Sequence, residues 1–179
     1  MTKSIPRIGR CAHLFMMSCL LLISNAQADP PIRFMGVTAT DSYKTLHKQL
    51  FHSAEKRGYN GKQNNDNVAY WGEFADLKVF GASVSHAMLF TSDVGGITSR
   101  RLSIWLYSAV DFDGHVGELS RTNGEPNEIT ESLGNQASPI ASWSTAGDGI
   151  AYELVFEGGI ADEEGAAIHL KAHYASKKN

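Results

Sequence analysis

The stretch IASWSTAGDGIAYELVF, residues 140–156, indicates how this 179-residue chain is built. Its second half places large apolar side chains at every second position, at Ile150, Tyr152, Leu154 and Phe156. A two-residue period is typical of a strand with one buried face. Asp148 and Gly149 lie at the midpoint, and an Asp-Gly pair favours the tight turn that joins antiparallel strands. The stretch therefore predicts a β-hairpin.

The same period continues outward from the hairpin. Further strands are predicted at 32–38, 68–74, 77–83, 86–91 and 101–112. In the last of these, Leu102, Ile104, Leu106 and Val110 share one face. Trp105 and Tyr107 occupy the other face, and two aromatic side chains there predict that this face is covered as well.

AAIHLKAHYA, residues 166–175, leaves two interpretations open. As a strand it places His169, Lys171 and His173 on the face opposite Ile168 and Leu170. The two histidines would then be roughly 13 Å apart along the strand, too far to share one metal ion. As a helix it would place them one turn apart, where they could chelate. The strict alternation favours the strand, so we predict no metal site here.

One helix is predicted, at residues 41–57. Apolar residues recur at steps of three and four, at Tyr43, Leu46, Leu50 and Ala54. Asp41 is the expected N-terminal cap, and Gly58 is the expected stop signal.

Helix and strands together predict an α+β domain with one N-terminal helix packed on a curled antiparallel sheet of about six to seven strands. A β-sandwich or barrel with a flanking helix is the alternative.

Loops are expected at 59–67, 92–100, 113–137 and 157–165. The stretch 113–137 is long for a connection, and such loops are often functional or contain an unrecognised element. A short helix could follow Pro126. Because loops on a rigid sheet often carry binding groups, we expect any binding surface to use 113–137 with 92–100 and 157–165.

The first 28 residues have the three parts of a secretory signal peptide. Lys3, Arg7 and Arg10 precede a short apolar block, which is followed by an exit that ends in Ala26-Gln27-Ala28. The apolar block is shorter than the ~20 residues that a membrane-spanning helix needs. We expect cleavage between Ala28 and Asp29, which would release a single domain, 29–179, without a membrane anchor.

Composition narrows the chemistry of the expected mature domain. Both cysteines, Cys11 and Cys19, lie in the leader, so neither a disulfide nor a cysteine nucleophile is expected. An exported domain without cysteines fits a bacterial periplasm better than an animal secretion, and the expected location is periplasmic or secreted. Removing the three basic leader residues leaves 13 basic against 19 acidic side chains, a net charge of −6. The basic pair Arg100-Arg101 is expected to be a solvated strand start, so no nucleic-acid partner is expected.

No motif identifies a catalytic residue or a cofactor. Asp111, Asp113 and Glu118 resemble calcium ligands only loosely, because His115 occupies the fifth position of the loop pattern. Ser85 and His86 are adjacent and would point to opposite sheet faces, which excludes a catalytic pair. The candidate binding residues are Asp113, His115, Glu118, Arg121, Trp105 and Tyr107.

Two functions remain open. The first is an exported, non-enzymatic binding or inhibitory protein for a protein partner or a small ligand, since tryptophan and tyrosine favour interfaces. The second is a small periplasmic hydrolase of cell-wall or sugar polymers that uses carboxylates or histidines. A pocket that joins two or more of His86, His115, His169, Glu73 and Glu153 would favour the hydrolase, whereas a flat surface would favour the binding protein. The oligomeric state is not predicted.

Overall fold

The computed structural model describes residues 31–51, 74–131, 137–160 and 164–176, with the backbone alone at 62–63, 69–71 and 75–76. The expected leader and cleavage site lie outside these residues. The two described helices are α1 (Tyr43–Leu50) and α2 (Phe112–Asn123). The strands are β1 (Lys62–Gln63), β2 (Ala69–Trp71), β3 (Phe74–Val79), β4 (Ala82–Val94), β5 (Ile97–Leu106), β6 (Glu128–Thr130), β7 (Ile140–Gly147), β8 (Ile150–Glu157) and β9 (Ala167–Ala175).

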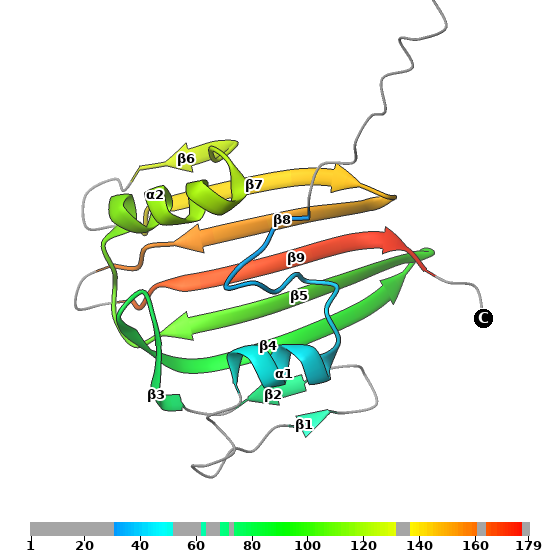
Figure 1. Ribbon diagram of the computed structural model, residues 1–179, viewed down its shortest axis with the longest axis horizontal. Helices are drawn as coiled ribbons and strands as arrows, with labels where there is room; N and C mark the ends of the chain where they lie inside the picture. The colour runs from blue at the N-terminus through cyan, green and yellow to red at the C-terminus, as the bar shows by residue number, and fades with distance from the viewer. Residues whose placement is uncertain are drawn as a thin grey trace, which may run out of the picture.

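The nine strands form one curled antiparallel sheet in the order β1-β2-β4-β5-β9-β8-β7-β6, and β3 pairs with β4 beside this path (Figure 1). Both helices and the N-terminal segment lie over the same face of the sheet in Figure 1. The α+β class with an antiparallel sheet is therefore confirmed, with more strands than expected and a second helix.

The buried apolar side chains of the described residues form one core between the sheet and the elements over it. Its centre is made of strand residues that are almost fully buried, among them Ile104, Leu154, Ile168 and Leu170. Leu119 of α2 belongs to the same cluster. The core therefore occupies one face of the sheet and leaves the opposite face available for other roles.

The hairpin at 140–156 is confirmed. Asp148 and Gly149 have φ values of 52° and 76°, as the two central residues of this turn type require. β9 confirms the strand interpretation of 166–175, and its residues Ile168, Leu170 and Ala172 are buried.

Several predicted strand boundaries were wrong. The expected strand 77–83 contains a turn at Phe80-Gly81, between β3 and β4. The expected strand 101–112 ends at Leu106, so Val110 is not on a strand. The expected strand 32–38 is instead a tight turn closed by a bridge between Phe34 and Val37.

Two of the expected loops also contain regular structure. The segment 92–100 is the paired end of β4 and β5, joined by a turn at Gly95-Gly96. The segment 113–137 contains most of α2 and all of β6, and the residues after Pro126 extend as a strand where a helix was considered. Asp111 accepts a hydrogen bond from the backbone N–H of Gly114 and so caps α2.

The expected helix 41–57 also begins differently. Ser42 caps α1 by accepting a hydrogen bond from the Thr45 N–H at 3.1 Å. The carboxylate of Asp41 instead accepts a bond from the Thr38 N–H at 2.7 Å, so it closes the preceding turn. Residues 52–58, which include Ala54 and Gly58, lie outside the described part of the chain.

Candidate functional site

The sheet face opposite the helices carries histidine, serine, glutamate, lysine, arginine and tryptophan side chains from four strands. We call it the outer face. It consists of alternate residues of β4, β5, β9 and β8, namely His86, Met88, Phe90, Ser99, Arg101, Ser103, Trp105, His169, Lys171, His173, Ala151, Glu153, Val155 and Glu157. Strand register brings these residues together from four separate parts of the sequence.

Three aromatic rings cluster at one end of the outer face. The rings of His86 and Trp105 stack with their centroids 4.3 Å apart, and His169 meets Trp105 edge-on at 5.8 Å. Burial lowers the pKa of His86, because a desolvated imidazole disfavours the charged form. This end of the face is therefore an aromatic cluster in which burial disfavours the charged form of His86.

Ser85 and His86 are in contact, although adjacent strand residues were expected to point to opposite faces. Between the Val84 and His86 pairings the register of β4 shifts, so Ser85 is an extra, bulged residue. Its Oγ lies 3.0 Å from Nδ1 of His86 and donates a hydrogen bond to the carbonyl of Trp105 at 3.1 Å. The Ser85 hydroxyl has a single hydrogen, so His86 Nδ1–H is the donor in the first contact. The expectation of opposite faces was wrong because the bulge re-aims the side chain.

Ser103, His169 and Glu157 form a chain of contacts with the composition of a hydrolytic triad. His169 Nδ1 lies 2.9 Å from Ser103 Oγ, and His169 Nε2 lies 3.5 Å from Glu157 Oε1. However, Ser103 is fully buried, so a substrate carbonyl could not reach its hydroxyl. Its strand is paired on both sides, by β4 and by β9, which engages the backbone N–H groups that could form an oxyanion hole. The contacts of His169 with Ser103 and Glu157 therefore hold the side chains of β5, β9 and β8 in place and do not form a catalytic triad.

The contact with His169 changes the titration of Glu157. A hydrogen bond from His169 lowers the pKa of Glu157 below its usual value, and this effect outweighs the opposing effect of burial. A carboxyl whose folded-state pKa is depressed contributes stability that is present above its unfolded pKa and is lost as the pH falls through the folded pKa.

We therefore expect the unfolding free energy of the wild type to fall more steeply between about pH 5 and pH 3 than that of Glu157→Gln. Urea unfolding followed by tryptophan fluorescence at several pH values measures this slope. Glu128→Gln removes an exposed carboxylate from β6 and serves as the control. Parallel pH profiles for the wild type and Glu157→Gln would contradict the expectation.

The other end of the outer face is cationic. In register across β4, β5, β9 and β8 lie Phe90, Arg101, Lys171 and Glu153, and we call these four residues the cationic row. Next to the row, His173 Nδ1 lies 2.8 Å from Ser99 Oγ. A shallow pocket of about 200 Å³ is lined here by Phe90, Ser99, Arg100, Arg101, Lys171 and His173.

The two adjacent arginines point in opposite directions. Arg100 donates hydrogen bonds to the carbonyls of Thr40 and Asp41, both at 2.8 Å, and so ties the segment before α1 to the sheet. Arg101 is exposed on the outer face. The interpretation of Arg100-Arg101 as a simple solvated pair was therefore wrong for Arg100.

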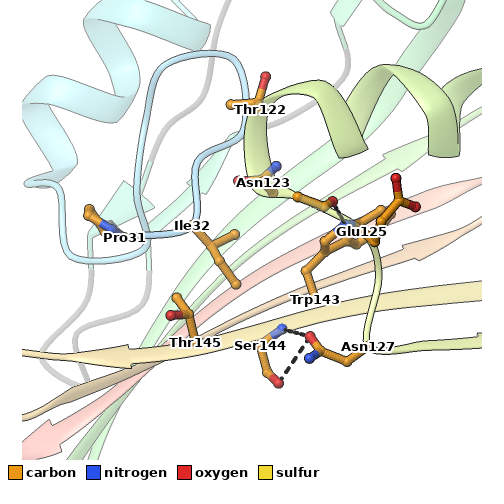
Figure 2. A pocket seen from close by; sticks show the side chains of 10 residues that line it. Pro31, Ile32, Thr122, Asn123, Glu125, Asn127, Trp143, Ser144 and Thr145 are labelled. Atoms are coloured by element: carbon orange, nitrogen blue, oxygen red, sulfur yellow. Dashed lines mark hydrogen bonds between the residues drawn. The ribbon is translucent and has the colours of Figure 1, made fainter. Parts of the chain in front are cut away.

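A second pocket, of about 400 Å³, lies where α2 ends over β7 (Figure 2). Trp143 donates a hydrogen bond from Nε1 to the Gly124 carbonyl at 2.8 Å. Asn127 Oδ1 accepts bonds from the backbone and hydroxyl of Ser144, and Asn123 exchanges two bonds with the backbone of Arg33. The hydrogen bonds of these side chains hold the N-terminal segment and the loop after α2 in place. We therefore assign the polar groups of this pocket a structural role.

The sequence-predicted binding residues do not form one surface. Asp113, His115, Glu118 and Arg121 all lie on α2, over the core face of the sheet. His115 stacks on Phe80 at 4.2 Å and lies 3.4 Å from Glu118. Trp105 lies on the outer face, and Tyr107, 58% exposed, follows the end of β5.

The residues considered for a hydrolase are not gathered in a pocket. His86 and His169 meet around Trp105 on an open sheet face, whereas His115 lies on the other side of the sheet. Glu73 lies outside the described residues. A third pocket, of about 440 Å³, is formed by β7 and β8 with His173. None of these three pockets, all formed by described residues, is lined by His86, His115 or His169.

His169 and His173 each contact a different serine on β5. Within the described ranges, no three histidine or acidic side chains are arranged to hold a metal ion. Neither described helix has the length and apolar run that a membrane crossing would require.

Comparisons of the chain with protein-family models, with curated proteins and with solved structures found no match. Function is therefore inferred from the residues themselves.

Proposed function

We propose that the chain is an exported, non-enzymatic binding protein that recognises a protein partner through its outer face. The leader at 1–28 and the expected cleavage between Ala28 and Asp29 support export, to the periplasm or beyond the cell. No nucleic acid, cofactor or metal ion enters the proposal.

The observation that carries the proposal is the cationic row. Arg101 and Phe90 are exposed there, side by side on paired strands. Arginine and aromatic residues are enriched at protein interfaces, and both can anchor a partner on a rigid sheet. In this proposal the expected binding segment 113–137 is replaced by the strands themselves, whereas the expected segments 92–100 and 157–165 contribute Ser99 and Glu157 to the outer face.

The side chains that could act in hydrolysis are buried or bonded to one another, which favours a binding role over hydrolysis. Ser103 is buried, and His169 contacts both Ser103 and Glu157. Glu153 pairs with Lys171 at 3.1 Å. A general acid or base needs free access to a substrate, whereas a binding surface needs exposed groups held rigidly.

Site-specific photo-crosslinking in cells that export the protein tests this proposal. A photoreactive amino acid at Ala151, which is exposed beside His173 on the outer face, should form an adduct with one discrete protein. The same amino acid at Glu118, exposed on α2, is the control and should give no such adduct. An adduct that forms equally from both positions, or from Glu118 alone, would refute the outer face as the binding surface.

A further inference from the structure

The cationic row contains an arrangement that does not favour folding. Arg101 and Lys171 are directly opposite one another on paired strands β5 and β9. Cross-strand partners have their Cβ atoms about 4.5–5.5 Å apart, and like charges placed there are destabilising. The sheet therefore carries two cations together on a chain whose net charge is −3.

Only one of these two cations is neutralised by the described residues around it. Lys171 Nζ donates a hydrogen bond to Glu153 Oε2 at 3.1 Å. Glu153 lies on β8, which pairs with β9 on the side opposite β5. Arg101 makes no comparable contact with any residue that the structure describes, and its neighbour on β4 is Phe90. The three charged residues of the row, Arg101, Lys171 and Glu153, therefore leave one net positive charge, centred on the guanidinium of Arg101.

The surrounding groups complete a site for an oxyanion. In the tautomer whose Nδ1 accepts the hydrogen of the Ser99 hydroxyl, the Nε2–H of His173 is the donor left for an anion in the pocket of about 200 Å³. A guanidinium can hold a carboxylate through two parallel hydrogen bonds, and Lys171 adds a second charge nearby. Phe90 supplies an apolar wall for the carbon chain that bears the anion.

We propose that this pocket binds a carboxylate of an acidic segment on the protein partner, with Arg101 as the principal anchor and Glu153 as a competitor for Lys171. This inference rests on the proposed function, because it names the chemistry that the partner must present. One net charge is too small a footprint for a nucleic-acid backbone, where affinity grows with the number of phosphates neutralised.

The test uses purified protein and a fluorescently labelled hexaglutamate peptide, with binding measured by fluorescence anisotropy at low salt. Arg101→Gln should weaken binding at least about tenfold, because hydrogen bonds between charged groups are stronger than neutral ones. Glu153→Gln should strengthen it several-fold, because Lys171 is released for the peptide. Arg121→Gln on α2 is the matched control for Arg101→Gln, and Glu128→Gln on β6 is the matched control for Glu153→Gln. Each control changes the net charge by the same amount as its counterpart and should alter binding less than about twofold.

Equal weakening by Arg101→Gln and Arg121→Gln would overturn the proposal, since the peptide would then sense only the total charge. Unchanged or weaker binding by Glu153→Gln would overturn the role of Glu153. Inorganic phosphate that competes as strongly as unlabelled hexaglutamate would assign the pocket to free anions instead of an acidic segment.

If the peptide results hold but Ala151 gives no adduct in cells, the pocket stands and the proposed function fails. If the adduct forms but is unaffected by Arg101→Gln, the function stands and the pocket fails.

Discussion

Replacing Trp143 with alanine is expected to lower the free energy of unfolding by about 3–5 kcal/mol, the range for deleting a large buried aromatic side chain. Trp143 is 1% exposed and is the largest fully buried side chain among the described residues. Its indole also holds the loop after α2 through the bond to the Gly124 carbonyl. The substitution therefore opens a cavity in the core and frees a carbonyl at the same time.

Urea unfolding monitored by circular dichroism gives the measurement, and two further variants separate the contributions. Trp143→Phe keeps much of the ring volume but removes the N–H donor, so the part of the loss due to the hydrogen bond should be about 1 kcal/mol. Trp105→Ala removes a partly exposed tryptophan from the outer face and should cost less than Trp143→Ala. A larger loss of stability from Trp105→Ala than from Trp143→Ala would contradict the placement of the core on the sheet face that carries Trp143.

The hairpin at 140–156 and the strand at 166–175 could be predicted because their signals are local. An Asp-Gly pair specifies its turn regardless of the rest of the fold, and strict alternation identifies the buried face of a strand. The same alternation correctly placed His169, Lys171 and His173 together on the outer side of β9.

Helix α2 was missed although it carries a helical pattern. Phe112, Val116 and Leu119 recur at steps of four and three, and all three pack in or against the core. Two glycines, Gly114 and Gly117, lie inside this helix, and glycine disfavours a helix interior. A Cβ on Gly114 would collide with the carboxylate of Asp111, so this glycine leaves room for the cap. The helix is stabilised by its packing and its cap more than by its intrinsic propensity.

The cationic row could not be found from sequence because it depends on register between distant strands. Phe90, Arg101, Lys171 and Glu153 become neighbours only when β4, β5, β9 and β8 pair in this order. The polar and glycine-rich composition of 92–100 predicted a loop there, and it hid the paired strand ends on either side of the turn at Gly95-Gly96. Trp105 and Tyr107 were identified as candidates because aromatic residues stand out without knowledge of their partners.

Gly165→Ala is expected to destabilise the domain by more than about 3 kcal/mol, which is at the upper end for a single added methyl group. A Cβ at this position would lie far inside van der Waals contact with the carbonyl oxygen of Leu106, which is backbone and cannot rotate away. The two segments are also joined by backbone hydrogen bonds, from Leu106 N–H to the Ala166 carbonyl at 2.8 Å and from Ala166 N–H to the Ser108 carbonyl at 3.0 Å. Relieving the clash would separate the start of β9 from the end of β5, and β9 carries Lys171 and His173 of the outer face.

Gly117→Ala provides the matched control, because a Cβ there meets no atom within 4 Å. In the middle of α2 this change should instead stabilise the domain by about 0.4–1 kcal/mol, since alanine restricts the unfolded chain and favours a helix. Both variants add one methyl group and can be compared by the same thermal and urea transitions. Opposite signs are expected because the two glycines differ in what surrounds them. A small effect at Gly165 would show that the close approach of β5 and β9 can relax, and the rigid pairing that places Arg101 opposite Lys171 would lose its support.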